Sequence, residues 1–282
     1  MSLSVARALL AAHAMGLDRL DAQLLLGHLM QRPRAWLIAH DDAIVPDDLA
    51  TRFAADCQRR AAGEPLAYLT GEREFHGLRL QVSPAVLVPR PDTETLVDWA
   101  LACCAEAPTD RPLALLDLGT GSGAIALALA HALRTRHPAA RITATDLSPD
   151  ALAVAATNAQ RLGLAVEFSQ GAWWAAVLPE RRFDLIASNP PYICEGDPHL
   201  PALRHEPIAA LTSGADGLDA LRAIVASAPQ HLLPGGWLLL EHGWDQADAA
   251  SRLLADAGFS GVATRPDIEG RPRCSGGRWY PP

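Results

Sequence analysis

A buried strand that runs directly into a glycine-rich loop is the feature that most constrains the fold of this chain. Residues 115–118 read Leu-Leu-Asp-Leu, and glycines follow at positions 119, 121 and 123. A helix is predicted from about Gly123 to Arg134. Together these elements form a nucleotide cradle, because glycines let the backbone approach a ligand and free N–H groups of the helix face it. The segment therefore predicts a doubly wound α/β domain that binds a nucleotide-containing cofactor.

The next predicted strand, over residues 141–146, ends in an acid. Asp146 falls where a doubly wound fold places the carboxylate that binds ribose hydroxyls. The loop alone leaves NAD possible, because the pattern Gly-x-Gly-x-x-Ala that begins at Gly119 also fits the dinucleotide fingerprint. Two residues favour S-adenosylmethionine instead. Asp117 stands where methyltransferases carry an acid, and Gly123 makes the pattern Gly-x-Gly-x-Gly.

A second motif, Asn189-Pro190-Pro191-Tyr192, follows the apolar stretch over residues 183–188 and indicates methyl transfer to a planar NH2 nitrogen. Such a nitrogen is a poor nucleophile because its lone pair is delocalised. The Asn189 side-chain oxygen and the Pro190 carbonyl can both accept hydrogen bonds from that NH2 group. The two prolines fix φ and aim the carbonyl, and the Tyr192 ring can lie flat against the amide or base.

The alternative interpretation of this motif is a turn with a purely structural role, since asparagine and proline both favour turns. The glycine loop upstream argues for a site. The strand over 183–188 is the fourth of its domain, so its end falls beside the loop of the first strand, at the switch point where ligands bind. The motif also has no evident use in hydride transfer. S-adenosylmethionine is therefore the predicted cofactor, and NAD is the alternative.

Composition indicates an ordinary globular protein. The chain is 49% hydrophobic and 20% charged, and no apolar run approaches the roughly 20 residues of a transmembrane helix. Its five cysteines include no C-x-x-C pair, and an odd count without a secretory signal predicts reduced thiols and a cytoplasmic location. Cys103 and Cys104 are predicted to be packing residues. The ten histidines show no metal-ligand spacing, and the reaction needs no metal.

The net charge bears on the partner. The chain has 24 basic and 32 acidic residues, a formal charge of −8. Proteins that hold nucleic acid through its phosphates usually show a basic domain or stripe. The Arg59-Arg60 and Arg181-Arg182 pairs are as consistent with solvated surface as with phosphate contacts. An acidic enzyme fits a basic protein substrate better, so neither a direct nucleic-acid partner nor a membrane is expected.

Periodicity divides the chain into a helical part, a linker and an α/β part. The helical domain is predicted over residues 1–75, with helices over 3–14, 18–30, 33–40 and 47–62. Residues 68–82 change to period two, which predicts a β-hairpin. This hairpin linker and a connecting helix over about 92–105, capped by Asp92, are assigned to residues 76–110.

The α/β domain is predicted over residues 111–282. Strands and helices alternate to about residue 257, and the tail is predicted to close with strands over 261–264 and 276–280. Such alternation implies a largely parallel sheet with helices on both faces.

At this point the chain resembles the protein-glutamine N5-methyltransferases of the PrmC/HemK type, which methylate the glutamine of the Gly-Gly-Gln motif in peptide-chain release factors. The resemblance spans the whole chain and rests on four stretches: Gly71–Phe75, Val88–Glu94, Asp117–Gly123 and Asn189–Tyr192. It implies a helical substrate-binding N-terminal domain, joined by a hairpin to a seven-stranded, Rossmann-like class I methyltransferase domain. It also implies S-adenosylmethionine as methyl donor, S-adenosylhomocysteine as product, and class 1 release factors as partners.

Residue by residue, the resemblance implies a cofactor site and a substrate site. The cofactor's methionine part would lie over Gly119, Thr120, Gly121, Ser122 and Gly123. Asp146 would bind the ribose, Trp173 would pack against the adenine, and Asn189 would meet both cofactor and substrate. The substrate amide would lie against Asn189, Pro190, Pro191 and Tyr192, of which Asn189, Pro190 and Tyr192 are the predicted catalytic residues. Many relatives have Asp where this chain has Ala172, so an acidic contact to adenine is missing.

Two other functions remain as alternatives at this stage. An N6-adenine methyltransferase acting on DNA or RNA uses a similar (Asn/Asp)-Pro-Pro-(Tyr/Phe) loop, because an adenine amine poses the same electronic problem. Such an enzyme must reach its base and hold phosphates, which the acidic charge disfavours. An inactive scaffold of the same fold is the second alternative, but it has no need of the glycine loop, Asp146 and Asn-Pro-Pro-Tyr together.

Overall fold

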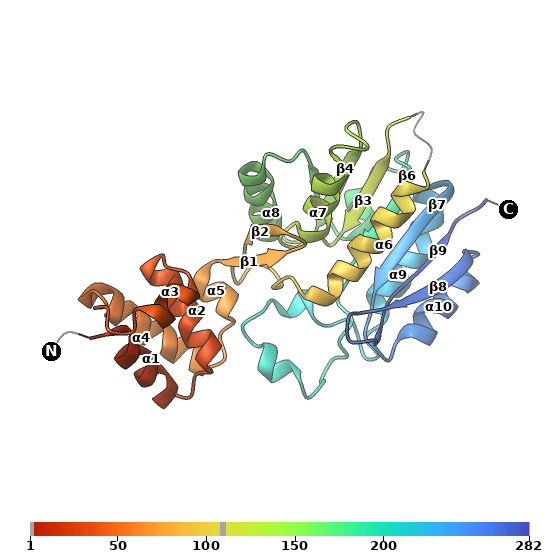
Figure 1. Ribbon diagram of the computed structural model, residues 1–282. Helices are drawn as coiled ribbons and strands as arrows, with labels where there is room; N and C mark the ends of the chain where they lie inside the picture. The colour runs from red at the N-terminus through yellow and green to blue at the C-terminus, as the bar shows by residue number, and fades with distance from the viewer. Residues whose placement is uncertain (1–2, 108–110, 282) are drawn as a thin grey trace. The chain divides into compact units, whose positions relative to one another are not determined.

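The computed structural model describes residues 3–107 and 111–281 and divides the chain into two compact units. The first unit ends at Glu72 and the second begins at Arg73. The division therefore falls inside the first strand of the hairpin, whereas the sequence placed it at residue 75. Figure 1 follows both units from the N-terminus to the C-terminus.

The first unit is helical, as predicted. Its helices are α1 (Val5–Ala14), α2 (Arg19–Met30), α3 (Arg34–Ala39), α4 (Asp47–Ala61) and α5 (Leu66–Thr70). The side chain of Asp18 caps α2 by accepting a hydrogen bond from Leu20 N at 2.7 Å. Buried apolar residues such as Leu25, Leu37 and Phe53 form its core. The period-two pattern was wrong at its start, because residues 68–70 complete α5 before the hairpin begins.

The second unit is built on a mixed sheet of seven strands in the order β5-β4-β3-β6-β7-β9-β8. The strands are β3 (Ala114–Leu118), β4 (Arg141–Asp146), β5 (Glu167–Gln170), β6 (Phe183–Ser188), β7 (Leu232–Glu241), β8 (Ser260–Pro266) and β9 (Pro272–Arg278). Strands β3 to β7 pair in parallel, and β9 pairs antiparallel with both β7 and β8. The predicted largely parallel sheet with a closing pair of strands is confirmed. The hairpin strands β1 (Glu72–Phe75) and β2 (Leu78–Gln81) form a separate two-stranded sheet.

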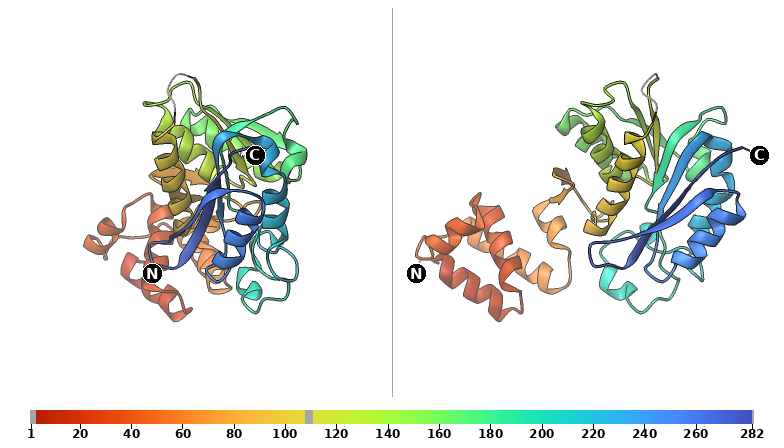
Figure 2. Two further views of the ribbon diagram at one scale, coloured as in Figure 1. Left: turned by 90° about the vertical axis from the view of Figure 1, so that its right-hand side faces the viewer. Right: turned by 45° about the vertical axis from the view of Figure 1, so that its right-hand side comes forward.

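Helices cover both faces of the large sheet (Figures 1 and 2). One face packs against α6 (Glu94–Ala105), α7 (Ala124–Leu133) and α8 (Pro149–Leu162), and the other against α9 (Asp219–Ser227) and α10 (Ala247–Asp256). The central strands are apolar on both sides, as a doubly covered parallel sheet requires. Cys103 and Cys104 are buried in the α6 face, in agreement with their predicted packing role. No helix among the described residues has both the length and the apolar character needed to span a bilayer.

Short 3-10 turns connect several of these elements: η1 (Pro91–Thr93), η2 (Trp173–Ala176), η3 (Leu200–Leu203), η4 (Ile208–Ala210) and η5 (Ala228–His231). The first of them corrects one prediction. Asp92 does not cap α6, because it lies within η1 and pairs with Arg273 at 3.3 Å. Helix α6 instead begins at Glu94 without a side-chain cap.

The topology brings three loops to one edge of the sheet. Strand β3 lies between β4 and β6, and its last residue, Leu118, is in register with Thr145 and Ser188. The loops after β3, β4 and β6 therefore start at the same edge. This is the switch point at which open α/β sheets bind their ligands.

Candidate active site

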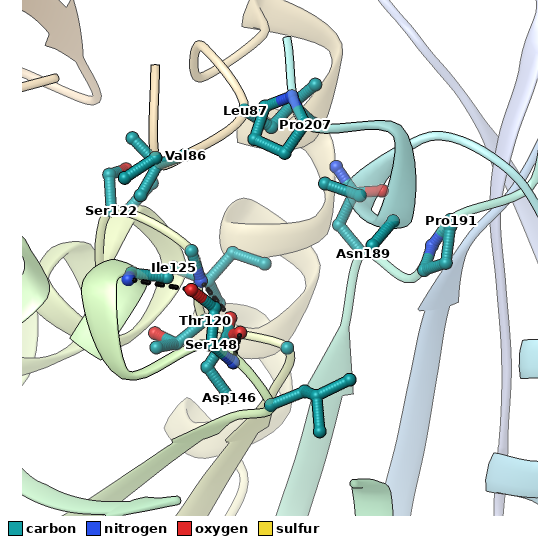
Figure 3. Close-up of a pocket in the computed structure, with 18 of the residues that line it drawn as sticks. Val86, Leu87, Thr120, Ser122, Ile125, Asp146, Ser148, Asn189, Pro191 and Pro207 are labelled. Atoms are coloured by element: carbon teal, nitrogen blue, oxygen red, sulfur yellow. Dashed lines mark hydrogen bonds between the residues drawn. The ribbon is translucent and has the colours of Figure 1, made fainter. Parts of the chain in front are cut away.

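A cavity of about 320 Å³ lies at this edge, within the size range of small-molecule sites. The predicted residues that line it are Gly119, Thr120, Gly121, Ser122, Asp146, Trp173, Asn189 and Pro191. Figure 3 shows Asn189 and Pro191 across the cavity from Thr120 and Asp146. Three predicted residues, Gly123, Pro190 and Tyr192, lie outside its lining.

The glycine loop takes a backbone shape that other residues adopt only with strain. Gly119 and Gly123 have φ angles of 75° and 86°. A Cβ at Gly123 would stand 2.9 Å from Leu127 Cδ1, so this glycine serves close packing of the loop on α7 and not ligand contact. The amides of Gly119 and Thr120 both donate to the carbonyl of Thr145, at 2.9 and 2.8 Å. These bonds hold the loop against the end of β4.

Asp146 ties the second loop to the first. Its carboxylate accepts from Gly121 N at 2.8 Å and from Ser148 N at 2.9 Å, and it borders the cavity. Two backbone donors keep this carboxylate oriented, so its remaining acceptor capacity faces the ligand space. A carboxylate in this place suits a vicinal diol such as a ribose.

Asp117, the acid before the glycines, supports the loop from beneath. Its side chain is fully buried, and its Oδ2 accepts from Thr120 Oγ1 at 2.7 Å and from Ala126 N at 3.1 Å. Burial raises the pKa of Asp117 to about 7, although these two donors act in the opposite direction. The residue does not line the cavity, so it shapes the loop and the start of α7.

The two adjacent tryptophans face different surroundings. Trp173 borders the cavity and has a φ of 47°, and its ring is near enough that a Cβ on Gly119 would stand 3.4 Å from it. Trp174 points away: its Nε1 donates to Ala223 O at 3.1 Å, and its ring stacks on His231. Only Trp173 is therefore placed to contact a ligand. Ala172 also borders the cavity and offers no side-chain acceptor there.

The Asn-Pro-Pro-Tyr loop is held by side chains from other elements. Asn189 Nδ2 donates to Thr93 Oγ1, in η1, at 3.1 Å. The carbonyl of Tyr192 accepts from Gln246 Nε2, just before α10, at 3.0 Å. Burial, followed by the charge of Glu241, raises the pKa of the Tyr192 hydroxyl, which stays protonated. The hydrogen bond from Nδ2 to Thr93 thus orients the Asn189 amide, and Oδ1 is the atom that can accept a hydrogen bond from a ligand.

Two further carboxyls near the site, Glu206 and Glu241, were not selected from the sequence. Glu206 accepts from Val88 N at 3.0 Å and pairs with Arg90, so it joins two segments that both border the cavity. Glu241 ends β7 fully buried, and burial raises its pKa to about 7 against the opposing effects of Thr93 and Arg273. Neither residue belongs to a recognisable motif, and their partners are far away in the sequence.

Comparisons with known proteins identify the family of this chain. A family model described as the PrmC N-terminal domain matches residues 2–71, and one described as a methyltransferase domain matches residues 115–214. A release factor glutamine methyltransferase of Xylella fastidiosa (strain Temecula1 / ATCC 700964) is 51% identical over 274 residues, which cover 96% of this chain and 97% of that protein. The chain belongs to the release factor glutamine methyltransferase family. A second member, from Bordetella pertussis, is 50% identical over 93% of this chain and 95% of its own length.

Membership of the release factor glutamine methyltransferase family makes the chain an S-adenosylmethionine-dependent methyltransferase and removes the NAD alternative. A solved methyltransferase structure from Pyrococcus furiosus matches with a TM-score of 0.52 at 20% identity, over 73% of this chain and 90% of that one. That likeness shows the shared class I fold. The cavity fits the cofactor, because it offers a glycine loop, a carboxylate at the end of β4 and an aromatic ring around one apolar space.

Proposed function

We propose that this enzyme transfers a methyl group from S-adenosylmethionine to the side-chain amide N5 of the glutamine in the Gly-Gly-Gln motif of class 1 peptide-chain release factors. The observation that carries the proposal is the orientation of Asn189. Its Nδ2 is engaged by Thr93 Oγ1 at 3.1 Å, so its Oδ1 is the end available to accept a hydrogen from a substrate NH2 group. The name of the relatives supplies the identity of the protein substrate.

The cofactor is proposed to lie across the glycine loop. Gly119, Thr120, Gly121, Ser122 and Gly123 would form or shape the surface under its methionine part, Asp146 would accept from the ribose hydroxyls, Trp173 would pack against the adenine, and Asn189 would meet both cofactor and substrate. The bound cofactor supplies an electrophilic methyl carbon on a sulfonium leaving group. Because Ala172 has no polar side-chain atom, we infer that backbone groups bind the adenine amine.

The Asn-Pro-Pro-Tyr loop is proposed to hold and activate the substrate amide. Asn189 Oδ1 and the Pro190 carbonyl would accept the two amide hydrogens, which draws electron density onto the nitrogen as it becomes pyramidal. Pro191 keeps the loop rigid, and the Tyr192 ring would order the amide plane and exclude water. No strong base is required before attack, because the nitrogen becomes acidic only as it gains the methyl group.

The helical first unit is proposed to bind the release factor, and the enzyme is proposed to act in the cytoplasm. The family model that matches this unit is described as the PrmC N-terminal domain. The formal charge of −8 suits a basic protein substrate better than a nucleic acid. An adenine methyltransferase would have to hold phosphates, for which the composition offers no basic segment.

Methyl transfer from labelled S-adenosylmethionine to three substrates tests the proposal. The substrates are a purified class 1 release factor, its Gln-to-Ala variant in Gly-Gly-Gln, and a duplex DNA. Label on the intact factor alone supports the glutamine function. Label on the DNA, or equal label on both forms of the factor, would overturn it.

A further inference from the structure

Gln246 holds the backbone of the Asn-Pro-Pro-Tyr loop from outside the set of residues that line the cavity. It is half-buried and directly precedes α10. Its Nε2 donates to the carbonyl of Tyr192 at 3.0 Å and to the carbonyl of Asp216 at 3.4 Å. Its Oε1 accepts from Gly243 N at 2.9 Å. One side-chain amide therefore joins the loop after β7 to the Asn-Pro-Pro-Tyr loop and to the turn before α9.

The three partners of Gln246 fix the direction of its amide. A backbone N–H can only donate, so Gly243 requires the amide oxygen, whereas the two carbonyls can only accept and require the amide nitrogen. A flipped amide would lose all three hydrogen bonds. The carbonyl of Tyr192 therefore always meets a donor from Gln246.

The peptide between Tyr192 and Ile193 is held at both of its polar ends. Its carbonyl accepts from Gln246, and its N–H donates to Leu211 O at 2.9 Å. Because a peptide is planar and its C=O and N–H point in opposite directions, these two bonds fix the rotation of the plane. The plane in turn sets ψ of Tyr192, so the backbone from which the tyrosine ring projects is held in one conformation.

Gly217 allows the turn before α9 to close over this hydrogen bond. Its φ is 74°, in the region that favours glycine. A Cβ at this position would stand 2.2 Å from Tyr192 O and 2.7 Å from Gln246 Nε2. A side chain here would therefore displace the donor or the acceptor, and glycine leaves the bond between them intact.

We propose that Gln246 is a positioning residue of the methyl transfer, which sets the direction of the Tyr192 ring against the substrate amide by holding the Tyr192 carbonyl. A ring that orders the plane of the amide is effective only at one angle, and groups of this kind depend on supporting hydrogen bonds. Gln246 does not touch the reacting atoms and moves no proton. The inference rests on the proposed function, because the role of the Tyr192 ring belongs to that function.

Substitution of Gln246 by glutamate tests the inference. Gln246→Glu keeps the shape and the acceptor for Gly243 N, but it puts an oxygen where the donor to two carbonyls stood. We expect kcat with the release factor to fall by about tenfold, the equivalent of about 1.4 kcal/mol. The dissociation constant of S-adenosylmethionine, measured by calorimetry, should change less than about twofold, since the glycine loop is untouched.

Two further variants control for charge and for the loop itself. Gln246→Met removes the donor without adding a charge, and it should lower kcat to a similar extent. Asp245→Asn changes the charge of the exposed neighbour on the same loop, and it should keep the wild-type kcat.

A double-mutant cycle shows whether Gln246 acts through the Tyr192 ring. Tyr192→Leu removes the ring, and Gln246→Glu is then added in that background. We expect the added change to lower kcat there by less than about twofold, because no ring is left to orient.

The inference is overturned if Gln246→Glu has the wild-type kcat, if its defect is wholly weaker cofactor binding, or if Asp245→Asn is equally impaired. A defect of Gln246→Glu that is as large without the Tyr192 ring as with it would also overturn the inference. Wild-type enzyme in the same assay separates the two proposals, because no methylation of the release factor by wild type contradicts the proposed function itself.

Discussion

Two buried acids lie beneath the two loops that border the cavity, and the structure uses them differently. Asp117 receives hydrogen bonds from Thr120 Oγ1 and Ala126 N, both from its own loop and the helix that follows. Among the described residues, neither carboxylate oxygen of Glu241 has a hydrogen-bond partner, and the loop above it is held by Thr93 and Gln246, which bond Asn189 and Tyr192. The glycine loop is therefore shaped locally, whereas the Asn-Pro-Pro-Tyr loop is assembled from distant parts. Changes to the first should weaken cofactor binding, and changes to the second should slow transfer.

The largest effect is expected from Asn189→Ala. Loss of a preorganised acceptor for the substrate amide should reduce kcat by roughly 10²-fold or more. Turnover at saturating S-adenosylmethionine is the measurement, with the cofactor dissociation constant determined in parallel. If the variant only binds cofactor more weakly and turns over normally once saturated, the role assigned to Asn189 is wrong.

The next effect is the pH dependence of the unfolding free energy, to which the buried Glu241 contributes. The pKa of Glu241 is raised from 4.5 to about 7, chiefly by burial, among Thr93, Tyr192, Asp92, Arg273 and Cys274. The native state therefore keeps a proton that the unfolded state releases, and the free energy of unfolding falls as pH rises from about 4.5 to about 7. The contribution is on the order of 3 kcal/mol for this shift. Asp117 contributes in the same direction.

Glu241→Gln should remove one of these two contributions. Urea unfolding at pH 5 and pH 8 would show a smaller difference in unfolding free energy for the variant than for wild type. An unchanged difference would mean that Glu241 does not titrate in this window.

A moderate effect on cofactor affinity is expected from a substitution of Asp146, which holds the glycine loop. Asp146→Asn keeps the shape but removes the charge that orients Gly121 N and Ser148 N and is proposed to accept from the ribose. The dissociation constant of S-adenosylmethionine should rise by about tenfold, the equivalent of about 1.4 kcal/mol. With cofactor saturating, kcat should stay near wild type. A large fall in kcat with unchanged cofactor affinity would contradict the assignment of cofactor binding to the glycine-loop side and of methyl transfer to the Asn-Pro-Pro-Tyr loop.

The smallest effect is expected on cofactor affinity when Trp173 is replaced, and its neighbour Trp174 provides the comparison. Trp173→Leu should raise the cofactor dissociation constant by about three- to tenfold, because an aromatic ring against the adenine is lost. Trp174→Leu is the matched control, since that residue packs on α9 and His231, and it should affect the melting temperature more than cofactor affinity. Equal effects of both variants on affinity would contradict the different placements of the two rings.

The sequence predicted the elements whose shape depends on neighbouring residues, but it did not predict contacts between residues that are far apart in the chain. The strands over 141–146 and 183–188 were predicted with the bounds that the structure shows, and the second is a largely apolar run of the kind that marks a buried parallel strand. The glycine loop was also predicted from the sequence, since its shape depends on residues that are close together in the chain. Thr93 was not selected, although it binds Asn189, because 96 residues separate the two. Periodicity does not reveal which distant side chains converge at the end of a strand.

The same limit explains the error at Asp92 and the omission of Glu206. A residue such as Asp92 before a predicted helix is a common cap, but here a guanidinium from β9 competes for its carboxylate. Glu206 binds Val88 N across 118 residues and lies outside any regular element. Both partnerships arise from the tertiary fold.

The most direct test of the account is to locate the transferred methyl group. After reaction with S-adenosylmethionine, the release factor would be digested and its peptides sequenced by mass spectrometry, with the Asn189→Ala enzyme in parallel. The account predicts one added methyl group on the side-chain amide of the glutamine in Gly-Gly-Gln, greatly reduced with the variant. A methyl group on any other residue, or full methylation by Asn189→Ala enzyme, would contradict it.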